Sequence, residues 1–399
     1  MNATSAKPSI AFLHDAFPCG GVERITMDLA DFFTSKGIAV YVITAWYKPK
    51  LWPAGRTRNY EIITLPHMDL GHSLEDRAYI INLIREYKIG FLVCSRYIEF
   101  MPEILNATGC RLIYTNHGTP FWEVLTYRHS KKVNSKGFIR KLKWWFFYGP
   151  RCKWGNAFKH KFNRRYSRNL TWADAYVVLC EAYKEAIVSQ LKLHNHPLEK
   201  KFAVIPNPEI APPKVQLQKE KVLLYVGRMT YADKRVDRLI EIWRRIYKEV
   251  PDWQLLLVGG GEEKEKLEQQ AEGLERIHFE GTTDNVKPYY DRAAVLCLTS
   301  AFESWGLCLT EAQANGVIPI AFDCSAGVNQ ILAPSGINGI LVPQGDMDAY
   351  AAALLNLLHN EPQRILMQQN VLQKAKEYSL DHIGQLWLNL LDKLSVANL

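Results

Sequence analysis

The sequence has no long hydrophobic run and no paired cysteines. Hydrophobic residues make up 48% of the 399 residues, but no apolar stretch approaches the roughly 20 residues of a membrane-spanning helix. Residues 1–17 contain one lysine and no long apolar segment, so we expect no secretory signal there. The eight cysteines are scattered, without the close spacing of zinc ligands or disulfides. We therefore expect a globular cytoplasmic protein with reduced cysteines.

Acidic residues are missing from one stretch, residues 124–173, which holds fourteen of the 49 Lys and Arg residues. The whole chain has a net charge of +8, so subtracting these fourteen charges leaves −6 for the rest. The chain is thus a mildly acidic protein that carries one strongly basic block.

Aromatic residues recur within this block at helical spacing. Rings on one helical face and cations on the other predict an interfacial membrane helix that binds an anionic lipid surface. One alternative is an aromatic stripe that packs on the domain beneath a solvated basic face. RNA binding is another alternative, but no recognition module surrounds the block, so we expect no nucleic-acid partner. The positions are Phe138, Ile139, Leu142, Trp145 and Phe146 opposite Arg140, Lys141 and Lys143, and Trp154, Phe158, Phe162 and Tyr166 among Lys159, Lys161, Arg164 and Arg165.

Elsewhere, β-branched apolar runs alternate with amphipathic helices, a pattern typical of parallel α/β sheets. A chain of this length fits two such domains of about 200 residues each. Residues 206–221 contain four prolines and no core pattern, which predicts a linker between domains at 1–205 and 222–378. We expect helical structure after residue 340, and the apolar stretch 386–394 in the C-terminal helix 379–399 should pack back on the first domain. The expected strands are 9–14, 38–46, 61–65, 90–95, 110–116, 173–180, 201–205, 222–227, 254–261, 276–281, 294–300 and 317–323, and the expected helices include 22–37, 74–88, 235–249 and 284–292.

The most informative stretch is 301–316, which lies between two of these strands. A helix from Gly306 to Asn315 should open at the carboxyl edge of the sheet, where ligands bind and where a helix N-terminus favours phosphate. Glu303 in the loop and Glu311 in the helix would repel phosphate, but carboxylates suit sugar hydroxyls. A phosphate flanked by hydroxylated rings describes a nucleotide sugar.

Three further loops supply candidate residues at strand ends. Arg228 and Lys234 follow the strand 222–227 and would clamp a diphosphate, although solvated loop cations give the same pattern. The Gly20-Gly21 pair precedes the helix 22–37, which also fits a simple tight turn. His117 ends the strand 110–116, where a functional role competes with a structural one.

Together these residues resemble the retaining glycosyltransferases of glycosyltransferase family 4. The resemblance covers nearly the whole chain except the basic block, and it is more specific in the second domain than in the first. The similar motifs are GG-V-E at 20–23, HG at 117–118, VIPNP at 204–208, YVGRMTYADKRVDRLI at 225–240, LLLVGGG at 255–261, HFEGTTDNVKPYYDRA at 278–293, ESWGLCLTE at 303–311 and GINGILVPQGD at 336–346.

The resemblance implies a GT-B fold, in which two Rossmann-like doubly wound domains face each other across a cleft. It implies that the ribose hydroxyls bind Glu311 and that Glu303 and His117 contact the donor sugar. Arg228 and Lys234 would neutralise the diphosphate, and the backbone at Gly20, Gly21, Trp305, Gly306 and Leu307 would approach sugar and phosphate. It implies no metal and no cofactor beyond the co-substrate. Two departures are Asn207-Pro208, which should alter a turn, and Trp305-Gly306, which would reshape the sugar pocket.

These implications give a retaining, metal-independent hexosyltransferase. We expect transfer from a nucleotide sugar, UDP-linked, to a lipid-linked saccharide at the inner face of the cell membrane, in lipopolysaccharide or other surface-polysaccharide synthesis. Other hypotheses are a transferase with a soluble acceptor, a nucleotide-sugar epimerase, and a non-catalytic binding protein of the same fold.

Overall fold

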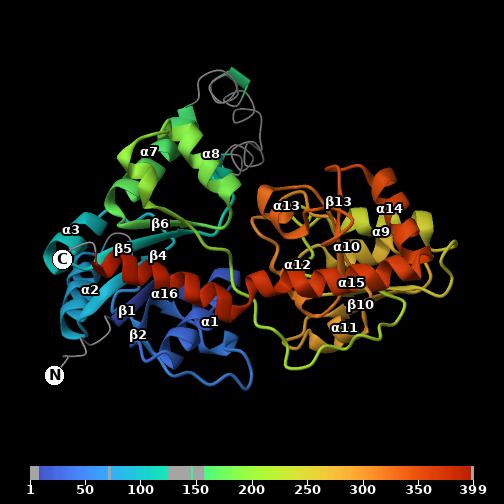
Figure 1. Ribbon diagram of the computed structural model, residues 1–399, viewed down its shortest axis with the longest axis horizontal. Helices are drawn as coiled ribbons and strands as arrows, with labels where there is room; N and C mark the ends of the chain where they lie inside the picture. Colours follow the sequence, from blue (N-terminus) through green and yellow to red (C-terminus); the bar gives the residue numbers. More distant parts are fainter. Residues whose placement is uncertain (1–8, 71–72, 125–144, 147–156, 397–399) are drawn as a thin grey trace.

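The computed structural model describes residues 9–70, 73–124, 145–146 and 157–396, and Figure 1 shows two α/β domains side by side. Each domain is built on a parallel sheet, seven-stranded in the first and six-stranded in the second. Helices cover both faces of each sheet. The expectation of two doubly wound α/β domains is confirmed.

The first sheet has the strand order β3-β2-β1-β4-β5-β6-β7. The order reverses between β1 and β4, and such a switch point opens a crevice at the carboxyl edge of the sheet. The elements are β1 (Ser9–Phe17), α1 (Gly21–Ser35), β2 (Val40–Tyr47), β3 (Glu61–Thr64), α2 (Leu74–Glu86), β4 (Ile89–Cys94), α3 (Met101–Thr108), β5 (Arg111–Asn116), α7 (Ala157–Trp172), β6 (Ala175–Val178), α8 (Glu181–Leu191) and β7 (Phe202–Val204).

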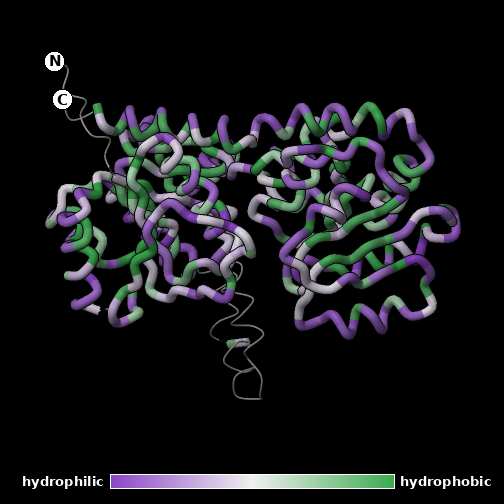
Figure 2. Tube along the Cα trace, turned by 90° about the horizontal axis from the view of Figure 1, so that it is seen from below, coloured by the Kyte–Doolittle hydropathy of each residue, from purple (hydrophilic) through white to green (hydrophobic). Residues whose placement is uncertain are grey.

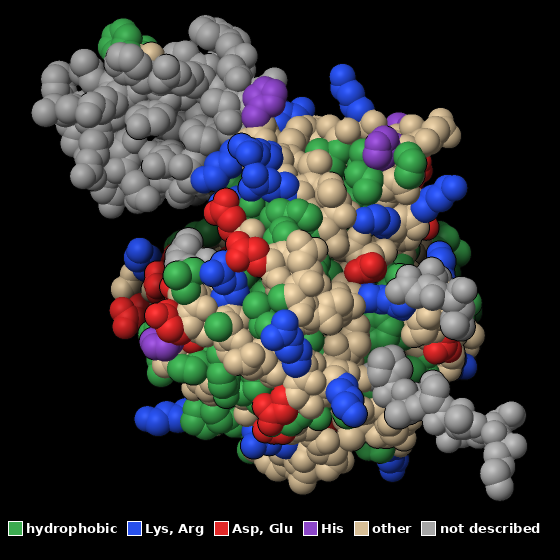
Figure 3. All heavy atoms as spheres, turned by 90° about the vertical axis from the view of Figure 1, so that its left-hand side faces the viewer, with side chains coloured by type: hydrophobic (Ala, Val, Ile, Leu, Met, Phe, Trp, Pro, Cys, Tyr) green, Lys and Arg blue, Asp and Glu red, His purple; other side chains and the backbone are tan. Residues whose placement is uncertain are grey.

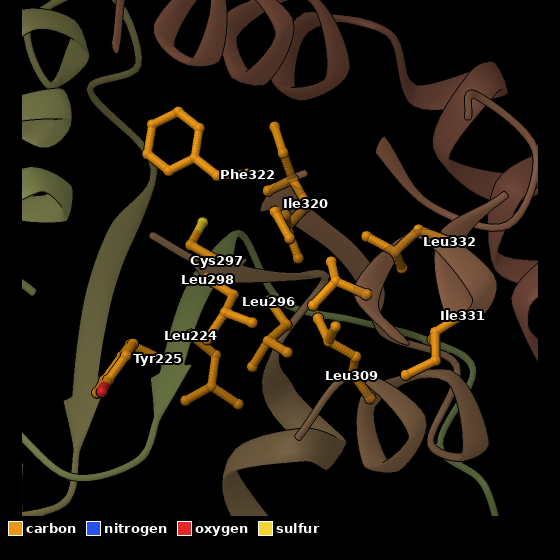
Figure 4. Close-up of a cluster of buried hydrophobic side chains, with 14 of the residues drawn as sticks. Leu224, Tyr225, Leu296, Cys297, Leu298, Leu309, Ile320, Phe322, Ile331 and Leu332 are labelled. Carbon is orange, nitrogen blue, oxygen red and sulfur yellow. The ribbon is translucent and has the colours of Figure 1, made fainter. Parts of the chain in front are cut away.

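The second sheet has the order β10-β9-β8-β11-β12-β13 and reverses between β8 and β11. Strands and helices of this domain meet in an apolar core, where Figure 4 shows Leu224 and Leu296 beside Leu309. The elements are β8 (Val222–Val226), α9 (Val236–Ile246), β9 (Gln254–Val258), α10 (Lys264–Gln270), β10 (Ile277–Gly281), α11 (Lys287–Arg292), β11 (Val295–Leu298), α12 (Leu307–Ala314), β12 (Ile318–Phe322), α13 (Ala326–Leu332), β13 (Ile340–Val342), α14 (Met347–His359) and α15 (Glu361–Ala375).

The last helix, α16 (Leu380–Val396), leaves the second domain and lies along the first (Figures 1 and 2). Trp387 of α16 is 3% exposed and packs edge-to-face on Phe33 of α1. Gly384 lies so close to Phe32 that a side-chain carbon there would be 2.4 Å from the ring. The return of the C-terminal helix to the first domain is confirmed, because its apolar face completes the core under α1.

Two expectations need correction. The chain is not purely helical after residue 340, since β13 forms the edge of the second sheet before the helices begin. In α7, Phe162 and Tyr166 are each 6% exposed, so these two rings of the expected membrane-facing stripe pack on the domain instead. Tyr166 stacks on Phe121 with 4.3 Å between ring centroids.

Much of the remaining basic block lies outside the described residues. Residues 138–144 and 147–149 of the predicted interfacial helix lie outside the described residues, as does Trp154, and the side chain of Phe158 is not described. Trp145 and Phe146 are exposed. Among the residues that the structure describes, no helix is both long and apolar enough to cross a membrane.

Candidate functional site

The predicted site residues come together at the carboxyl edges of both sheets. Gly20 and Gly21 follow β1, and His117 follows β5. In the second domain, the loop that carries Lys234 follows β8, and the loop that carries Glu303 follows β11. The loops after β1, β8 and β11 flank the switch points, where open α/β sheets bind ligands, and the loop after β5 lies one strand further along the same edge.

The N-termini of α1 and α12 meet across the two domains. Leu307 begins α12, and a side-chain carbon at Gly21 would lie 3.2 Å from its Cδ1 atom. The N-cap residue Gly306 has φ of 84°, a left-handed conformation that favours glycine. The two glycines thus allow two helix N-termini, each with free N–H groups and a positive dipole end, to approach the same space. An anion such as a diphosphate is the ligand that this arrangement favours.

Lys234 and Glu303 form an ion pair at the edge of this space. Their side chains are 18% and 9% exposed, and the Ser300 hydroxyl donates to Glu303 Oε1 at 3.0 Å. Burial opposes the charged form of Lys234, but the Glu303 carboxylate outweighs it and raises the pKa of the lysine. Lys234 is therefore a fixed cation, held with little freedom by a carboxylate that is itself anchored.

Arg228 is arranged differently from Lys234. Its side chain is 73% exposed and donates to Asp233 Oδ2 at 3.1 Å. The Asp233 carbonyl in turn accepts from the Ala301 N–H at 2.7 Å, which joins the loop after β8 to the loop after β11. The structure therefore brings Lys234 and Glu303 together directly, while Arg228 stands at the rim of the same loop.

Glu311 of α12 has partners from both domains. The Tyr290 hydroxyl donates to its Oε2 at 2.7 Å, and Arg24 of α1 forms an ion pair with its Oε1. Arg24 also lies 3.4 Å from Glu209, which follows β7 and accepts from the Thr310 hydroxyl at 3.2 Å. One first-domain cation thus joins two carboxylates at the base of the cleft.

The cluster of Arg24, Glu209 and Glu311 lies where the chain passes from one domain to the other. Glu209 forms an isolated bridge with Ser379, where the chain returns towards α16. Burial, with the negative charge of Glu311 added, raises the pKa of Glu209. Burial opposes the charge of Arg24, but the two carboxylates outweigh it and raise the pKa of Arg24. The positive charge of the Arg24 guanidinium therefore offsets the repulsion between the two neighbouring carboxylates in a buried position.

His117 is positioned by Asn207, which follows β7. Its Nδ1 atom lies 2.9 Å from Asn207 Oδ1, so the hydrogen-bond network assigns the proton to Nδ1 and leaves Nε2 free. Burial lowers the pKa of His117 to about 4, so the ring is neutral near pH 7. A neutral imidazole can hold a hydroxyl or carbonyl of a ligand without adding charge.

The residues after His117 contact the second domain. The Thr119 N–H donates to Ser304 Oγ at 3.4 Å, and the Thr119 hydroxyl donates to the Glu303 carbonyl at 3.3 Å. Trp122 lies 6.1 Å from Phe302 between ring centroids. The loop after β5 therefore contacts the loop that carries Glu303, and both domains contribute residues to the site.

Comparisons with known proteins agree with this geometry. The sequence profile of Glycosyltransferase Family 4 matches residues 19–208, and that of Glycosyl transferases group 1 matches residues 220–360. A protein of Haemophilus influenzae described as an uncharacterized glycosyltransferase is 31% identical over 386 residues, which span 95% of this chain and 98% of that protein.

The chain belongs to glycosyltransferase family 4.

A partial relative and a solved structure complete the comparison. The partial relative, from Campylobacter jejuni, is the GalNAc-alpha-(1->4)-GalNAc-alpha-(1->3)-diNAcBac-PP-undecaprenol alpha-1,4-N-acetyl-D-galactosaminyltransferase. The two sequences are 28% identical over 181 residues, which span 45% of this glycosyltransferase and 50% of the relative. The crystal structure of Anabaena HepE in complex with UDP has a TM-score of 0.72 at 17% identity, covering 96% of this chain and 100% of that one. This likeness confirms the GT-B fold.

One side chain of the glycosyltransferase differs from expectation. Trp305 is 2% exposed and packs edge-to-face on Tyr378, so its ring lies in the core and does not shape a sugar pocket. Its backbone still precedes the N-terminus of α12, which is where the resemblance placed it.

Sequence reasoning missed several partners in the site of the glycosyltransferase. Arg24 follows the conspicuous Gly20-Gly21 pair by three positions, and Asn207 lies in the quoted VIPNP motif, so a signal existed for both. Tyr290 lies in the quoted motif at 278–293 and Glu209 directly follows VIPNP, but their roles depend on contacts with Glu311 and Arg24 from distant parts of the chain.

No group of three or more His, Cys, Asp or Glu side chains within the described ranges is arranged to hold a metal ion. The acidic pair Asp346 and Asp348 serves the start of α14, where Asp346 accepts from the Ala349 N–H and Asp348 pairs with Arg245. The predicted absence of a metal stays a prediction.

Proposed function

We propose that this glycosyltransferase transfers a sugar from a UDP-linked donor to a lipid-linked saccharide, with retention of anomeric configuration and without a metal ion. The observation that carries the proposal is the fixed Lys234–Glu303 pair beside the N-terminus of α12, which faces the N-terminus of α1 across the cleft. These groups supply a cation, a carboxylate and free N–H groups in one place, as a nucleotide sugar requires.

In the proposed reaction, the bond between the anomeric carbon and the diphosphate oxygen breaks, and UDP leaves with the electron pair. The acceptor oxygen bonds to the anomeric carbon on the face from which UDP departs, and its proton passes to the departing diphosphate. Negative charge grows on the diphosphate as the bond breaks, so Lys234, Arg228 and the α12 N-terminus stabilise the transition state more than the ground state. Because these groups are already in place, we propose that no metal is needed.

The donor would lie with its ribose at Glu311 and its sugar at Glu303. Glu311 is held by Tyr290 and Arg24, so ribose hydroxyls would have to share or replace the Arg24 contact. Neutral His117, with Nε2 free, would accept a hydrogen bond from a sugar hydroxyl. The choice of UDP is supported by the UDP complex of HepE, which has the same fold.

The proposal of a lipid-linked acceptor is supported by a relative and by features of the first domain. The name of the Campylobacter relative contains a saccharide joined through PP to undecaprenol, and such an acceptor would be held at a membrane surface. In α7, the cations Lys159, Lys161, Arg164 and Arg165 are exposed, while the rings of Phe162 and Tyr166 pack inwards. Attraction of these cations to anionic lipid would bring the cleft to its acceptor.

Product analysis tests the proposal. The purified protein, incubated with UDP-sugars and a lipid extract, should release UDP only when a lipid-linked acceptor is present, should give a product with the anomeric configuration of the donor, and should keep its activity in EDTA. Inversion of the anomeric centre, or activity restored only by magnesium or manganese, would contradict it. Release of free sugar epimers without an acceptor would favour the epimerase, and full activity with soluble sugars would favour the soluble-acceptor transferase.

A further inference from the structure

A groove of about 450 Å³ lies in the first domain between α7 and the segment after β4. Five side chains of α7, which are basic or imidazole groups, face Tyr97 and a single carboxylate, Glu99. Figure 3 shows a gathering of Lys and Arg side chains on this side of the molecule. The α7 residues of the groove are His160, Lys161, Arg164, Arg165 and Arg168.

The side chains at the base of this groove are fixed. Arg168 donates to the Tyr97 hydroxyl at 2.7 Å and lies 3.7 Å from Glu99. The Arg165 guanidinium stands over the Tyr97 ring at 5.4 Å and over the Phe162 ring at 5.6 Å. Phe162 and Tyr97 thus fix the Arg165 guanidinium, and the Tyr97 hydroxyl fixes that of Arg168. A guanidinium held in place presents its planar fork of N–H donors to an oxyanion.

Among the described residues that line the groove, four cations face one carboxylate, Glu99. Helix α7 contains no acidic residue, although a solvated surface normally mixes charges of both signs. Burial and the nearby charge of Arg165 lower the pKa of Arg96, so cations crowd one another here. A bound anion would relieve this crowding.

We propose that the groove binds a phosphate ester or diphosphate on the acceptor side of the enzyme. Arg164 and Arg165 grip the phosphate oxygens, and Arg168, fixed by Tyr97, orients them. This proposal deepens the proposed function and rests on it in one respect, the placing of the acceptor in the first domain. Two ligands could supply the phosphate group: the diphosphate of a lipid-linked saccharide and the headgroup of an anionic lipid.

The groove is a better fit to a discrete phosphate than to a charged surface alone. A flat membrane requires cations spread over an exposed face with apolar groups beside them. The aromatic groups beside these cations, Phe162 and Tyr166, are instead buried, and the cations converge on a concave space. Arginine in pairs is also better suited than lysine to the bidentate binding of a phosphate.

The test is a titration of the full chain with inorganic pyrophosphate after its donor site has been saturated with UDP. The unchanged protein should bind pyrophosphate, and R164Q/R165Q should bind it roughly tenfold more weakly, since each lost charge-assisted contact is a large part of such an affinity. The control K159Q/K200Q removes the same charge from exposed lysines outside the groove and should bind as the unchanged protein does. R164Q alone keeps the ring contacts of Arg165 and should weaken binding in the same direction.

A second arm uses vesicles of phosphatidylcholine with and without phosphatidylglycerol, to which pyrophosphate is added as a competitor. Release of the unchanged protein by pyrophosphate assigns the groove to lipid headgroups, and groove-dependent pyrophosphate binding without vesicle binding assigns it to the acceptor. Equal pyrophosphate binding by R164Q/R165Q and K159Q/K200Q overturns the proposal, even where vesicle binding differs between them. Failure to bind UDP in the first step would count against the proposed function instead.

Discussion

The two halves of the cleft are built in opposite ways. In the second domain, charged side chains are held by buried partners, as Lys234 is by Glu303 and Glu303 is by Ser300. In the first domain, the site presents the glycine backbone at Gly20 and Gly21 and the neutral His117, while the exposed cations of α7 line a separate groove of the same domain.

The difference follows from what each half would bind. A nucleotide diphosphate has one shape, so a preorganised site in the second domain loses little entropy when it binds. An acceptor saccharide that carries phosphate can be met by exposed cations, whose attraction acts over distance but is screened by salt. The predictions below test this contrast, starting with the largest expected effect.

Replacing Lys234 with Ala should have the largest effect. It removes a fixed cation from the diphosphate and leaves Glu303 without its partner, so we expect a loss of about 2–4 kcal/mol of transition-state stabilisation. The measurement is kcat/KM with a UDP-sugar. Lys221→Ala, which breaks an exposed ion pair with Asp252, is the matched control and should leave kcat/KM unchanged. Equal activities of the two variants would show that the second domain does not bind the donor through this pair.

Replacing Arg24 with Ala should be next in size. Glu209 and Glu311 would then be buried without their counter-ion, but Arg24 is 38% exposed, so the cost is below that of a fully buried pair, about 1–3 kcal/mol. The measurement is the urea midpoint of unfolding. Arg77→Ala, which breaks a surface pair with Glu103, should shift the midpoint much less. A shift of the same size in both variants would mean that the inter-domain cluster stabilises the fold no more than a surface ion pair does.

His117 should give the stability a pH dependence. Its folded pKa of about 4 lies below the ordinary value of 6.5, so its contribution is present in full above pH 6.5 and is lost as the pH falls through 4. His117→Gln, which can still donate to Asn207, should therefore flatten the fall in unfolding free energy over this range. His194→Gln, a substitution at a surface residue, is the control. Parallel curves for wild type and His117→Gln would contradict the burial of a neutral ring.

The smallest effect should be that of substitutions in α7 on UDP affinity at the donor site. R164Q/R165Q should change UDP affinity by less than about 0.5 kcal/mol, because both arginines are exposed and salt screens exposed charges that do not contact the ligand. Calorimetric titration with UDP at physiological salt measures this. A large loss of UDP affinity would mean that the two halves of the cleft are coupled through charge, and that the contrast between them is wrong.

Local patterns in the sequence were enough to predict most of the fold. Short apolar strands in alternation with helices predicted both sheets, and the loops after β8 and β11 were located because Lys234 and Glu303 stand between a strand end and a helix start. The three-residue strand β13 was missed, since so short an apolar run does not stand out from a loop.

Other features depend on tertiary contacts that local patterns do not contain. Arg24 and Glu311 are 287 residues apart, and neither shows by its surroundings that it pairs with the other. The aromatic period in α7 defined one face of the helix but not what covers that face, so Phe162 and Tyr166 were assigned to a membrane when they pack on the domain. The burial of Trp305 was missed for the same reason.

The most direct test of the central claim, a nucleotide site at the N-terminus of α12, is the UDP-dependent thermal shift of wild type and Glu311→Ala. A ligand that binds only the native state stabilises it by about 2.7 kcal/mol at a hundredfold excess over its Kd. The account predicts a clear rise in Tm for wild type and little or none for Glu311→Ala at the same UDP concentration. An equal rise in both proteins, or none in wild type, would contradict it.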